Sequence, residues 1–155
     1  MLVDDVRRFD IFADLEAIEV KKLLQFAQVR QFNPKEVIFK QGDPGSGLFL
    51  IIKGEIEIYV EPSGNRVSLA LLKAGEFMGE MSLFGDGQQT RTASAMAEGN
   101  VVAVIISTVD FRRLQQSGPK ILSKLLLRLL MSLSTRYRNL KTELRTLMKE
   151  IEAEA

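Results

Sequence analysis

The sequence predicts an α+β fold, in which an antiparallel β-roll of jelly-roll type lies between N-terminal helices and a long C-terminal dimerisation helix. Three zones of different periodicity support it: helical spacing to about residue 28, short strands to about residue 107, and helical spacing again beyond. Glycine-rich turns separate the short strands, as is typical of small antiparallel rolls and barrels. We expect two units, residues 1–119 with the roll and residues 120–155 with the long helix.

The first zone predicts amphipathic helices. Leu15, Ile18 and Leu23 are spaced to share faces of a helix, and Asp14 is placed to act as a helix cap. The charged residues 4, 5, 7 and 8 lie where a signal peptide needs an apolar core. The longest unbroken apolar runs, residues 48–52 and 101–106, are too short to cross a bilayer. We therefore expect a cytoplasmic protein with no membrane partner.

The second zone predicts a series of short strands. Residues 55–60 alternate strictly between polar and apolar side chains, and the Pro-Ser-Gly-Asn turn at residues 62–65 joins them to the next strand as a hairpin. The strand candidates are Val37–Phe39, Leu48–Ile52, Glu55–Val60, Val67–Leu72, Thr92–Ala97 and Val101–Ile106.

The third zone predicts two helices. Thr108 can cap the first, residues 117–119 break it, and the second runs from about Lys120 towards Ile151. Two apolar series, each with a period of seven, form a seam on the second helix: Leu126, Leu133, Leu140 and Leu147, and Leu130, Tyr137, Leu144 and Ile151. Packing on its own domain suits residues 121–130, but a small roll is too short to cover the far end. We therefore expect a homodimer through residues 120–151.

Composition limits the chemistry of the chain. Its 21 basic and 20 acidic residues leave a formal net charge of +1, so no global field attracts nucleic acid or anionic lipid. The absence of histidine and cysteine excludes disulfides, Cys/His metal sites and a cupin-like metalloenzyme, although a carboxylate metal site stays open. We expect no enzyme, no catalytic residue and no cofactor.

The segment from residue 78 to residue 97 has the strongest chemical signal. Gly79 permits close approach of the backbone, and residues 80–84 can form a helical turn whose free N–H groups suit an anion. Arg91 opens an apolar strand, where a guanidinium is costly unless an anion meets it. The segment therefore predicts an anion site.

The same segment offers groups for a sugar phosphate. Thr92 supplies a hydroxyl for a phosphate oxygen, and Glu80 suits a ligand hydroxyl such as a ribose 2′-OH. Phosphate and sugar hydroxyl together indicate a nucleotide, and the chain has no G-x-x-x-x-G-K-[ST] motif for a triphosphate. The alternative is that Glu80 and Arg91 only pair with each other and tie a loop to a strand.

The segment closely resembles the phosphate-binding cassette of cyclic-nucleotide-binding domains, such as catabolite activator proteins and regulatory subunits of cAMP-dependent kinases. The family pattern is present as Met78-Gly79-Glu80-Met81-Ser82-Leu83, a variable loop (residues 85–89), and Arg91-Thr92-Ala93. Gly42-Asp43, Gly45, residues 48–51 and Gly54 resemble the glycine-punctuated hairpin of the family's β-roll. Phe39 departs from the pattern, since an aliphatic residue or Cys is more usual there. The resemblance covers nearly the whole chain.

The resemblance implies a ligand and the residues that hold it. Glu80 would accept from the ribose 2′-OH, and the phosphate would bind the cassette residues Gly79, Glu80, Met81, Ser82, Arg91 and Thr92. The base would lie against the hairpin, where the candidates are Val67, Leu69, Ala70 and Leu72. Arg136 and Tyr137 fall about where the family places base contacts, although Tyr137 also fits the helix seam. Thr92 leaves cGMP open beside cAMP.

The function implied is a regulatory domain that binds a cyclic mononucleotide, cAMP in the first instance, and transmits binding through its C-terminal helix to an unknown protein partner. The family's transcription factors continue into a helix-turn-helix domain, whereas this sequence ends at Ala155, so we expect no specific DNA binding by this chain. The alternative is a dimeric scaffold of the same fold with a degenerate pocket or another ligand.

Overall fold

The computed structural model describes residues 2–84 and 89–155, so most of the predicted loop at residues 85–89 lies outside the described residues. The helical segments are α1 (Leu2–Arg7), η1 (Asp10–Phe12), α2 (Ala17–Leu24), η2 (Glu80–Leu83), α3 (Thr108–Ser117) and α4 (Pro119–Glu154). The strands are β1 (Gln28–Phe32), β2 (Val37–Phe39), β3 (Gly47–Lys53), β4 (Glu55–Val60), β5 (Val67–Lys73), β6 (Phe77–Met78), β7 (Ser94–Ala97) and β8 (Val101–Ser107).

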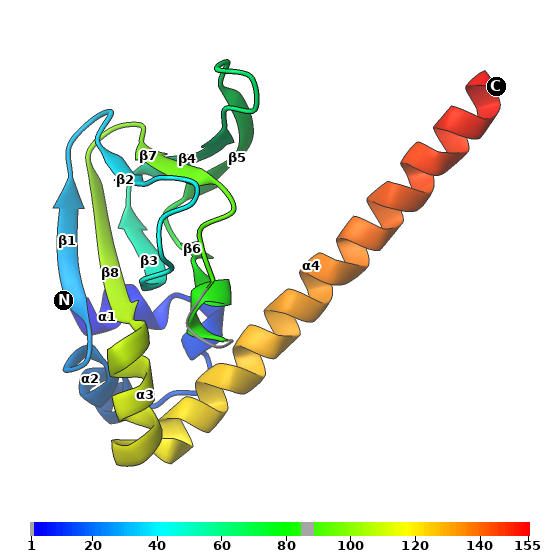
Figure 1. Ribbon diagram of the computed structural model, residues 1–155. Coiled ribbons are helices and arrows are strands. Elements are labelled where there is room, and N and C mark those ends of the chain that lie inside the picture. Colours follow the sequence, from blue (N-terminus) through cyan, green and yellow to red (C-terminus); the bar gives the residue numbers. More distant parts are fainter. Residues whose placement is uncertain (1, 85–88) are drawn as a thin grey trace.

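The strands form two four-stranded sheets, in the orders β1-β8-β3-β6 and β2-β7-β4-β5 (Figure 1). Every strand pair within them is antiparallel. The N-terminal helices and α3 lie at one end of the roll, and α4 diverges from it (Figure 1). The predicted α+β architecture, with an antiparallel β-roll, N-terminal helices and a long C-terminal helix, is confirmed.

The six predicted strands are present with close boundaries, except for one that is shorter, whereas β1 and β6 were not predicted. The β4–β5 hairpin runs from the pair Glu55↔Lys73 to the pair Val60↔Val67. The predicted strand at residues 92–97 begins only at Ser94. Just before it, Arg91 bonds to the loop that precedes β3: its N–H donates to the Asp43 carbonyl, and its own carbonyl accepts from the Gly42 N–H.

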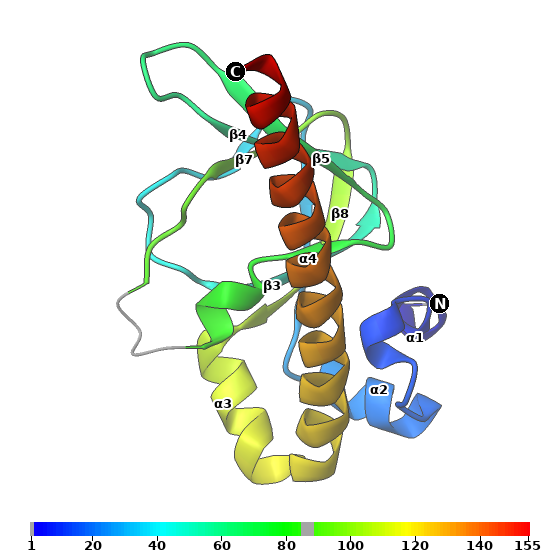
Figure 2. The ribbon, with the colours of Figure 1, turned by 90° about the vertical axis from the view of Figure 1, so that its right-hand side faces the viewer.

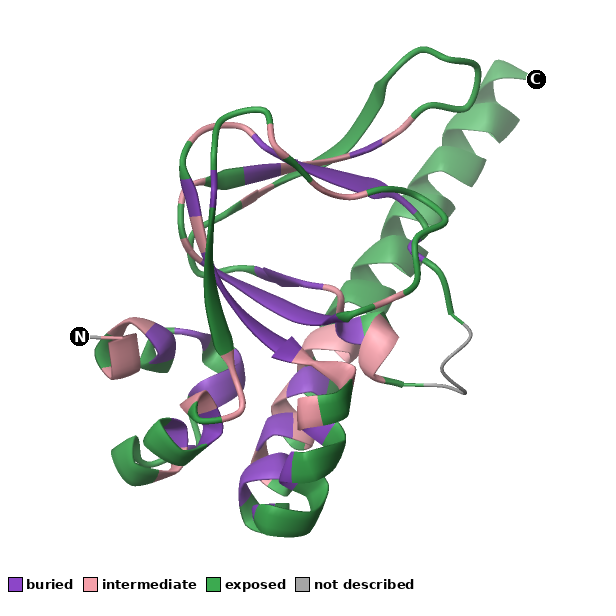
Figure 3. Ribbon diagram, turned by 60° about the vertical axis from the view of Figure 1, so that its left-hand side comes forward, coloured by how far each residue is buried: buried purple, intermediate pink, exposed green. Residues whose placement is uncertain are grey.

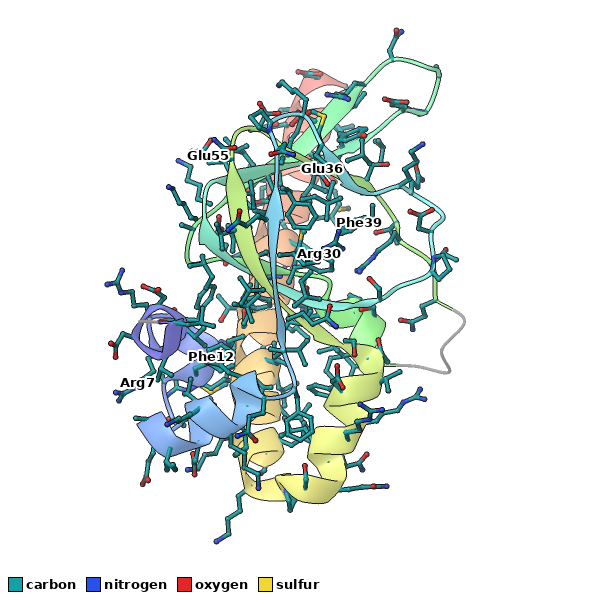
Figure 4. All side chains as sticks on the ribbon, turned by 90° about the vertical axis from the view of Figure 1, so that its left-hand side faces the viewer. Arg7, Phe12, Arg30, Glu36, Phe39 and Glu55 are labelled. Carbon is teal, nitrogen blue, oxygen red and sulfur yellow. The ribbon has the colours of Figure 1, made fainter. Side chains whose placement is uncertain are left out.

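Two apolar clusters hold the domain together. One joins α1, η1 and α2 to β3, β8, α3 and the start of α4, and it includes the fully buried Phe12 (Figure 4) and Leu125. The other fills the space between the two sheets and includes Phe49 and Ile56. Because the first cluster contains residues of α4, the base of the long helix is part of the domain core.

The structure corrects the predicted cap of the second N-terminal helix. Glu16 is the N-cap of α2, and its N–H donates to the Glu19 carboxylate at 3.2 Å. Asp14 instead accepts from both Nε and Nη2 of Arg128 in α4, at 2.7 and 2.8 Å. A carboxylate that reaches a guanidinium fork accepts two charge-assisted hydrogen bonds, whereas a helix cap does not offer such a pair.

The structure also corrects the predicted cap of α3. Ser107 is the N-cap, and its hydroxyl accepts from the Asp110 N–H at 3.1 Å. Thr108 is the first helical residue, and its hydroxyl donates to the Ser82 carbonyl at 3.3 Å. Thr108 therefore ties α3 to η2 instead of capping the helix.

Helix α4 has 36 residues, and its exposure changes along its length. Its buried residues, Ile121, Leu122, Leu125 and Leu129, all lie in the first three turns. Figure 2 shows the helix passing one side of the roll, and Figure 3 shows its far end exposed all round. Within the described residues, no helix combines the length and the apolar character that a membrane span requires.

Candidate functional site

A cavity of about 640 Å³ opens between the β2-β7-β4-β5 sheet, the segment around η2, and α4. This volume lies within the range of small-molecule pockets. Its apolar wall is formed by Phe39, Ile58, Leu72, Phe77, Met78 and Ala93. Its polar and charged lining is formed by Glu76, Glu80, Ser82, Gln89, Thr90, Arg91, Thr92 and Arg136, with Gly45, Gly79 and Met81 completing it.

Gly79 sets the backbone at the cavity wall. Its φ of 82° lies in the left-handed region, and a Cβ there would collide with the Gly47 carbonyl oxygen. The turn η2 therefore begins in close contact with β3. Among the described residues, the N–H groups of Glu80 and Met81 have no backbone acceptor, so both are available at the start of the turn.

Arg91 is the buried cation of the cavity, with only 7% of its surface exposed. Its Nη2 donates to the Ser46 hydroxyl at 3.1 Å and to the Gly47 carbonyl at 3.5 Å, and its Nε has no partner in the described part of the chain. The guanidinium carbon lies 4.2 Å from the ring centre of Phe39, which lies between the sheets (Figure 4), and 5.6 Å from that of Phe49.

These contacts explain the electrostatics of Arg91. Burial lowers the pKa of its guanidinium, although the negative charges of Glu80 and Asp43 oppose that shift. Two aromatic faces and neutral oxygens hold the cation without a carboxylate at ion-pair distance among the described residues. An anion entering the cavity would therefore gain a desolvated, oriented guanidinium.

Glu80 pairs with α4 and not with Arg91. Its Oε1 accepts from Nη1 of Arg136 at 2.9 Å, and its side chain is only 12% exposed. The Arg136 guanidinium also covers the Phe77 ring at 4.6 Å. The alternative that Glu80 and Arg91 simply pair with each other is therefore wrong for the described residues.

The remaining cassette residues divide into structural and exposed groups. The Ser82 hydroxyl accepts from the Gly47 N–H at 3.0 Å and lies 2.7 Å from the Gly79 carbonyl, while the Ser82 N–H donates to that same carbonyl. Ser82 therefore clamps η2 against β3. Thr92 and Met81 line the cavity with exposed side chains, and Met81 is 62% exposed.

The predicted base-contacting residues are not all at the cavity. Leu72 and Arg136 line it, whereas Val67, Leu69, Ala70 and Tyr137 do not. Val67 and Leu69 are 46% and 58% exposed, and Tyr137 is 62% exposed on α4. A ligand role for these four residues stays a prediction.

Sequence reasoning missed several residues of the site, among them Glu76 and Thr90 of the cavity lining. Phe39 and Phe49 hold the Arg91 guanidinium, Ile58 lines the cavity, and Phe77 supports Arg136. The alternation of β4 could have placed Ile58, since Ile56 and Ile58 share a face. No group of three or more metal-ligating side chains occurs within residues 2–84 and 89–155.

Comparisons with known proteins identify this arrangement. A family profile described as "Cyclic nucleotide-binding domain" matches residues 29–117. The cyclic AMP receptor protein of Thermus thermophilus is 34% identical over 95 residues, or 61% of this chain and 44% of that protein. A cAMP-activated global transcriptional regulator of Pseudomonas aeruginosa is 35% identical over 104 residues, or 65% of this chain and 49% of that one. The chain spans less than half the length of the curated relatives it matches.

Solved structures agree with the sequence comparison. The catabolite activator protein of Thermus thermophilus superposes with a TM-score of 0.77 at 31% identity, covering 89% of this chain and 62% of that one. A cyclic nucleotide-binding domain from Methylobacillus flagellatus superposes with a TM-score of 0.76 at 30% identity, covering 88% and 76%. Because the profile match spans more than half of the sequence, the chain belongs to the cyclic nucleotide-binding domain family.

Proposed function

We propose that this chain is a sensor domain that binds a cyclic mononucleotide, cAMP in the first instance, and passes the binding event to α4. The observation that carries the proposal is Arg91, a buried guanidinium held on Phe39 at the wall of a 640 Å³ cavity. A cyclic phosphate carries a single negative charge, which would balance the positive charge of this guanidinium. One oriented guanidinium fork also suits a single phosphate group better than a triphosphate.

The other ligand contacts follow from the cavity lining. The N–H groups of Glu80 and Met81 and the Thr92 hydroxyl would meet the phosphate, and the Glu80 carboxylate would accept from the ribose 2′-OH. The base would lie against the apolar wall that includes Ile58 and Leu72. These contacts support a nucleotide ligand but do not distinguish adenine from guanine, because the Thr92 hydroxyl suits either base.

We further propose that the chain is a homodimer through residues 120–151, with residues 1–119 as the ligand-binding unit. The support is the seam on α4, where Leu140, Leu144 and Leu147 are 63%, 58% and 55% exposed. Apolar residues repeating every seven positions on an exposed helix are typical of a coiled coil. Cytoplasmic location, an unknown protein partner and the lack of specific DNA binding stay predictions.

Calorimetric titration with cAMP and cGMP, with 5′-AMP as the acyclic control, tests the proposal. We expect saturable binding of at least one cyclic nucleotide and weaker binding of 5′-AMP, whose second phosphate charge has no second cation in the described cavity apart from the paired Arg136. The competing function is a dimeric scaffold with a degenerate pocket, which the exposed α4 seam alone would satisfy. No heat with either cyclic nucleotide would favour the scaffold.

The Glu80 role has its own test. Glu80→Ala should weaken cAMP more than 2′-deoxy-cAMP, because only the ribose hydroxyl loses its acceptor. One charge-assisted hydrogen bond is worth about 1.5–3 kcal/mol. Affinities for both ligands, measured on wild type and variant, give the comparison. Equal losses for the two ligands would reject a 2′-OH contact.

A further inference from the structure

The Arg91 guanidinium has no ion-pair partner among the described residues, although two carboxylates act on it. The charges of Glu80 and Asp43 act to raise its pKa, against the larger effect of burial. However, Asp43 Oδ2 accepts from the Lys40 N–H at 2.9 Å, and Glu80 Oε1 accepts from Arg136 at 2.9 Å. Because both carboxylates are engaged elsewhere, other groups must hold the buried cation.

Aromatic rings take the place of a counter-ion. The guanidinium carbon of Arg91 lies 4.2 Å from the ring centre of Phe39 and 5.6 Å from that of Phe49. The two rings meet edge to face, with their centres 5.9 Å apart. A cation gains more from a ring face where both are shielded from water, and Arg91 is only 7% exposed. Phe39, the nearer ring, therefore makes the stronger contact.

A β-bulge directs Phe39 towards the arginine. In the pairing of β2 with β7, Val37 faces Met96 and Phe39 faces Ala95, so β2 has one extra residue over this step. Ile38 and Phe39 are adjacent in the sequence, yet both pack against the apolar cluster between the sheets. Regular alternation would turn one of the two outward. Bulges are common next to functional sites, where they redirect a side chain.

The Phe39 contact places the guanidinium at the cavity wall before a ligand arrives. Phe39 and Arg91 both line the cavity. A free arginine side chain has many rotamers, and fixing it on ligand binding costs conformational entropy. A carboxylate could also fix the arginine, but its negative charge would repel an incoming phosphate. The neutral ring therefore orients the guanidinium without opposing an anionic ligand.

We propose that Phe39 is a positioning residue for the phosphate group: its ring holds the Arg91 guanidinium in the orientation that an anionic ligand meets. The proposal rests on the proposed function, and it concerns a position at which this sequence departs from the family pattern. Removing the ring releases the guanidinium, which can then turn towards the Asp43 or Glu80 carboxylate. The affinity for the cyclic nucleotide then falls but is not abolished, because the cation is still present.

The first test needs no ligand. A proton over the face of an aromatic ring resonates upfield in NMR spectra, so the side-chain N–H signals of Arg91 report whether a ring covers them. These signals are assigned by their loss in Arg91→Leu. We expect Phe39→Leu to move them downfield, and Phe39→Tyr, which keeps a ring, to leave them close to the wild-type position. Unchanged signals in Phe39→Leu would overturn the proposal, because the ring would not hold the guanidinium.

The second test measures cAMP affinity by calorimetry. We expect Phe39→Leu to weaken cAMP binding by about tenfold, as for loss of a desolvated cation–π contact, and Phe39→Tyr to bind close to wild type. Phe32→Leu is the matched control, because Phe32 is buried in the same cluster between the sheets and also carries a guanidinium, that of Arg30 at 4.9 Å. Phe32 is not part of the cavity lining, so Phe32→Leu should bind cAMP like wild type.

The two tests together distinguish this proposal from the proposed function. Weaker cAMP binding by Phe39→Leu with unmoved Arg91 signals would mean that the ring acts on the ligand directly, and moved signals with unchanged affinity would mean that the contact does not serve binding. An equal loss in Phe32→Leu would assign the effect to a loosened cluster. Each of these results would overturn the positioning role while leaving nucleotide binding intact. Wild type that binds neither cAMP nor cGMP would overturn the proposed function, and the positioning role with it, although the ring contact would still be visible in the ligand-free spectra.

Discussion

The two halves of α4 share one sequence pattern and differ in what covers it. In residues 119–136, Leu125 and Leu129 are buried against the domain, and charged residues make ion pairs with the N-terminal segment and the cassette. In residues 137–154, apolar side chains recur at the same spacing, yet Leu140 is 63% and Leu147 is 55% exposed. Among the described residues, only the first half is stabilised by contacts with other elements of the chain.

The difference shows that amphipathic periodicity indicates which face of a helix is apolar, but not what covers that face. The domain covers the side of the helix that carries Leu122 and Leu129, whereas the seven-residue seam lies on a neighbouring side. At 1.5 Å of rise per residue, the 36 residues of α4 span about 54 Å, and the helix extends beyond the roll (Figure 1). The first half therefore belongs to the domain core, and the second half needs a partner to bury its apolar face.

The largest expected effect contrasts one leucine from each half. Leu125→Ala removes a fully buried side chain and should destabilise the fold by about 2–5 kcal/mol, which lowers Tm by about 4–20 °C in a protein of this size. Leu147→Ala should weaken the association of the proposed dimer without destabilising the fold of the domain. Chemical denaturation at two protein concentrations separates the two, because an effect on a dimer depends on concentration. Equal destabilisation of dilute protein by both variants would contradict the division of α4.

The next effect is on assembly. Leu140→Glu combined with Leu147→Glu places charges in the seam and should give monomers by light scattering, with the roll still folded. Asn139→Glu combined with Thr146→Glu adds the same charge outside the seam and is the matched control. Wild type that is already monomeric at micromolar concentration would contradict the dimer, and dissociation by the control would show that charge alone, and not the seam, is responsible.

The smallest expected effect concerns the ion pairs of the first half. The Arg128 hydrogen bonds lower the pKa of Asp14, and the Lys124 hydrogen bond lowers the pKa of Glu19. A carboxyl whose folded pKa is depressed stabilises the fold above its unfolded pKa and loses that contribution as pH falls. Asp14→Asn and Glu19→Gln should therefore reduce the fall in Tm between pH 7 and pH 3. An unchanged fall would show that these pairs do not contribute measurably, as is common for exposed ion pairs.

Local patterns predicted most of the fold but not the contacts between distant segments. The strands at residues 37–39 and 55–60 and the long helix follow from periodicity alone. The position of Asp14 before a predicted helix indicates a cap, whereas its partner Arg128 lies on a helix more than 100 residues later. The Arg136–Glu80 pair depends on the angle at which α4 leaves the domain, which no local pattern encodes.

The face of β5 that is proposed to contact the base is hard to predict for a different reason. The pairing of β4 with β5 shifts register between Ile58 and Tyr59, so Ile58 faces Ala70 while Tyr59 faces Ser68. A β-bulge of this kind adds a residue and interrupts the alternation of faces. Leu72, on the near side of the shift, lines the cavity, whereas Val67, on the far side, does not. Alternation read along the sequence alone misses such a shift.

The measurement that tests the central claim most directly is the melting of wild type and Arg91→Leu with and without saturating cAMP. At a hundredfold excess over Kd a ligand stabilises the folded state by about 2.7 kcal/mol, which should raise the wild-type Tm by about 5–10 °C. Arg91→Leu should melt near the wild-type temperature without ligand, because it deletes a buried cation whose Nε has no partner in the described residues, and it should show no cAMP shift. Arg112→Leu, an exposed arginine of α3, should keep the full shift. A shift that survives in Arg91→Leu would contradict the account.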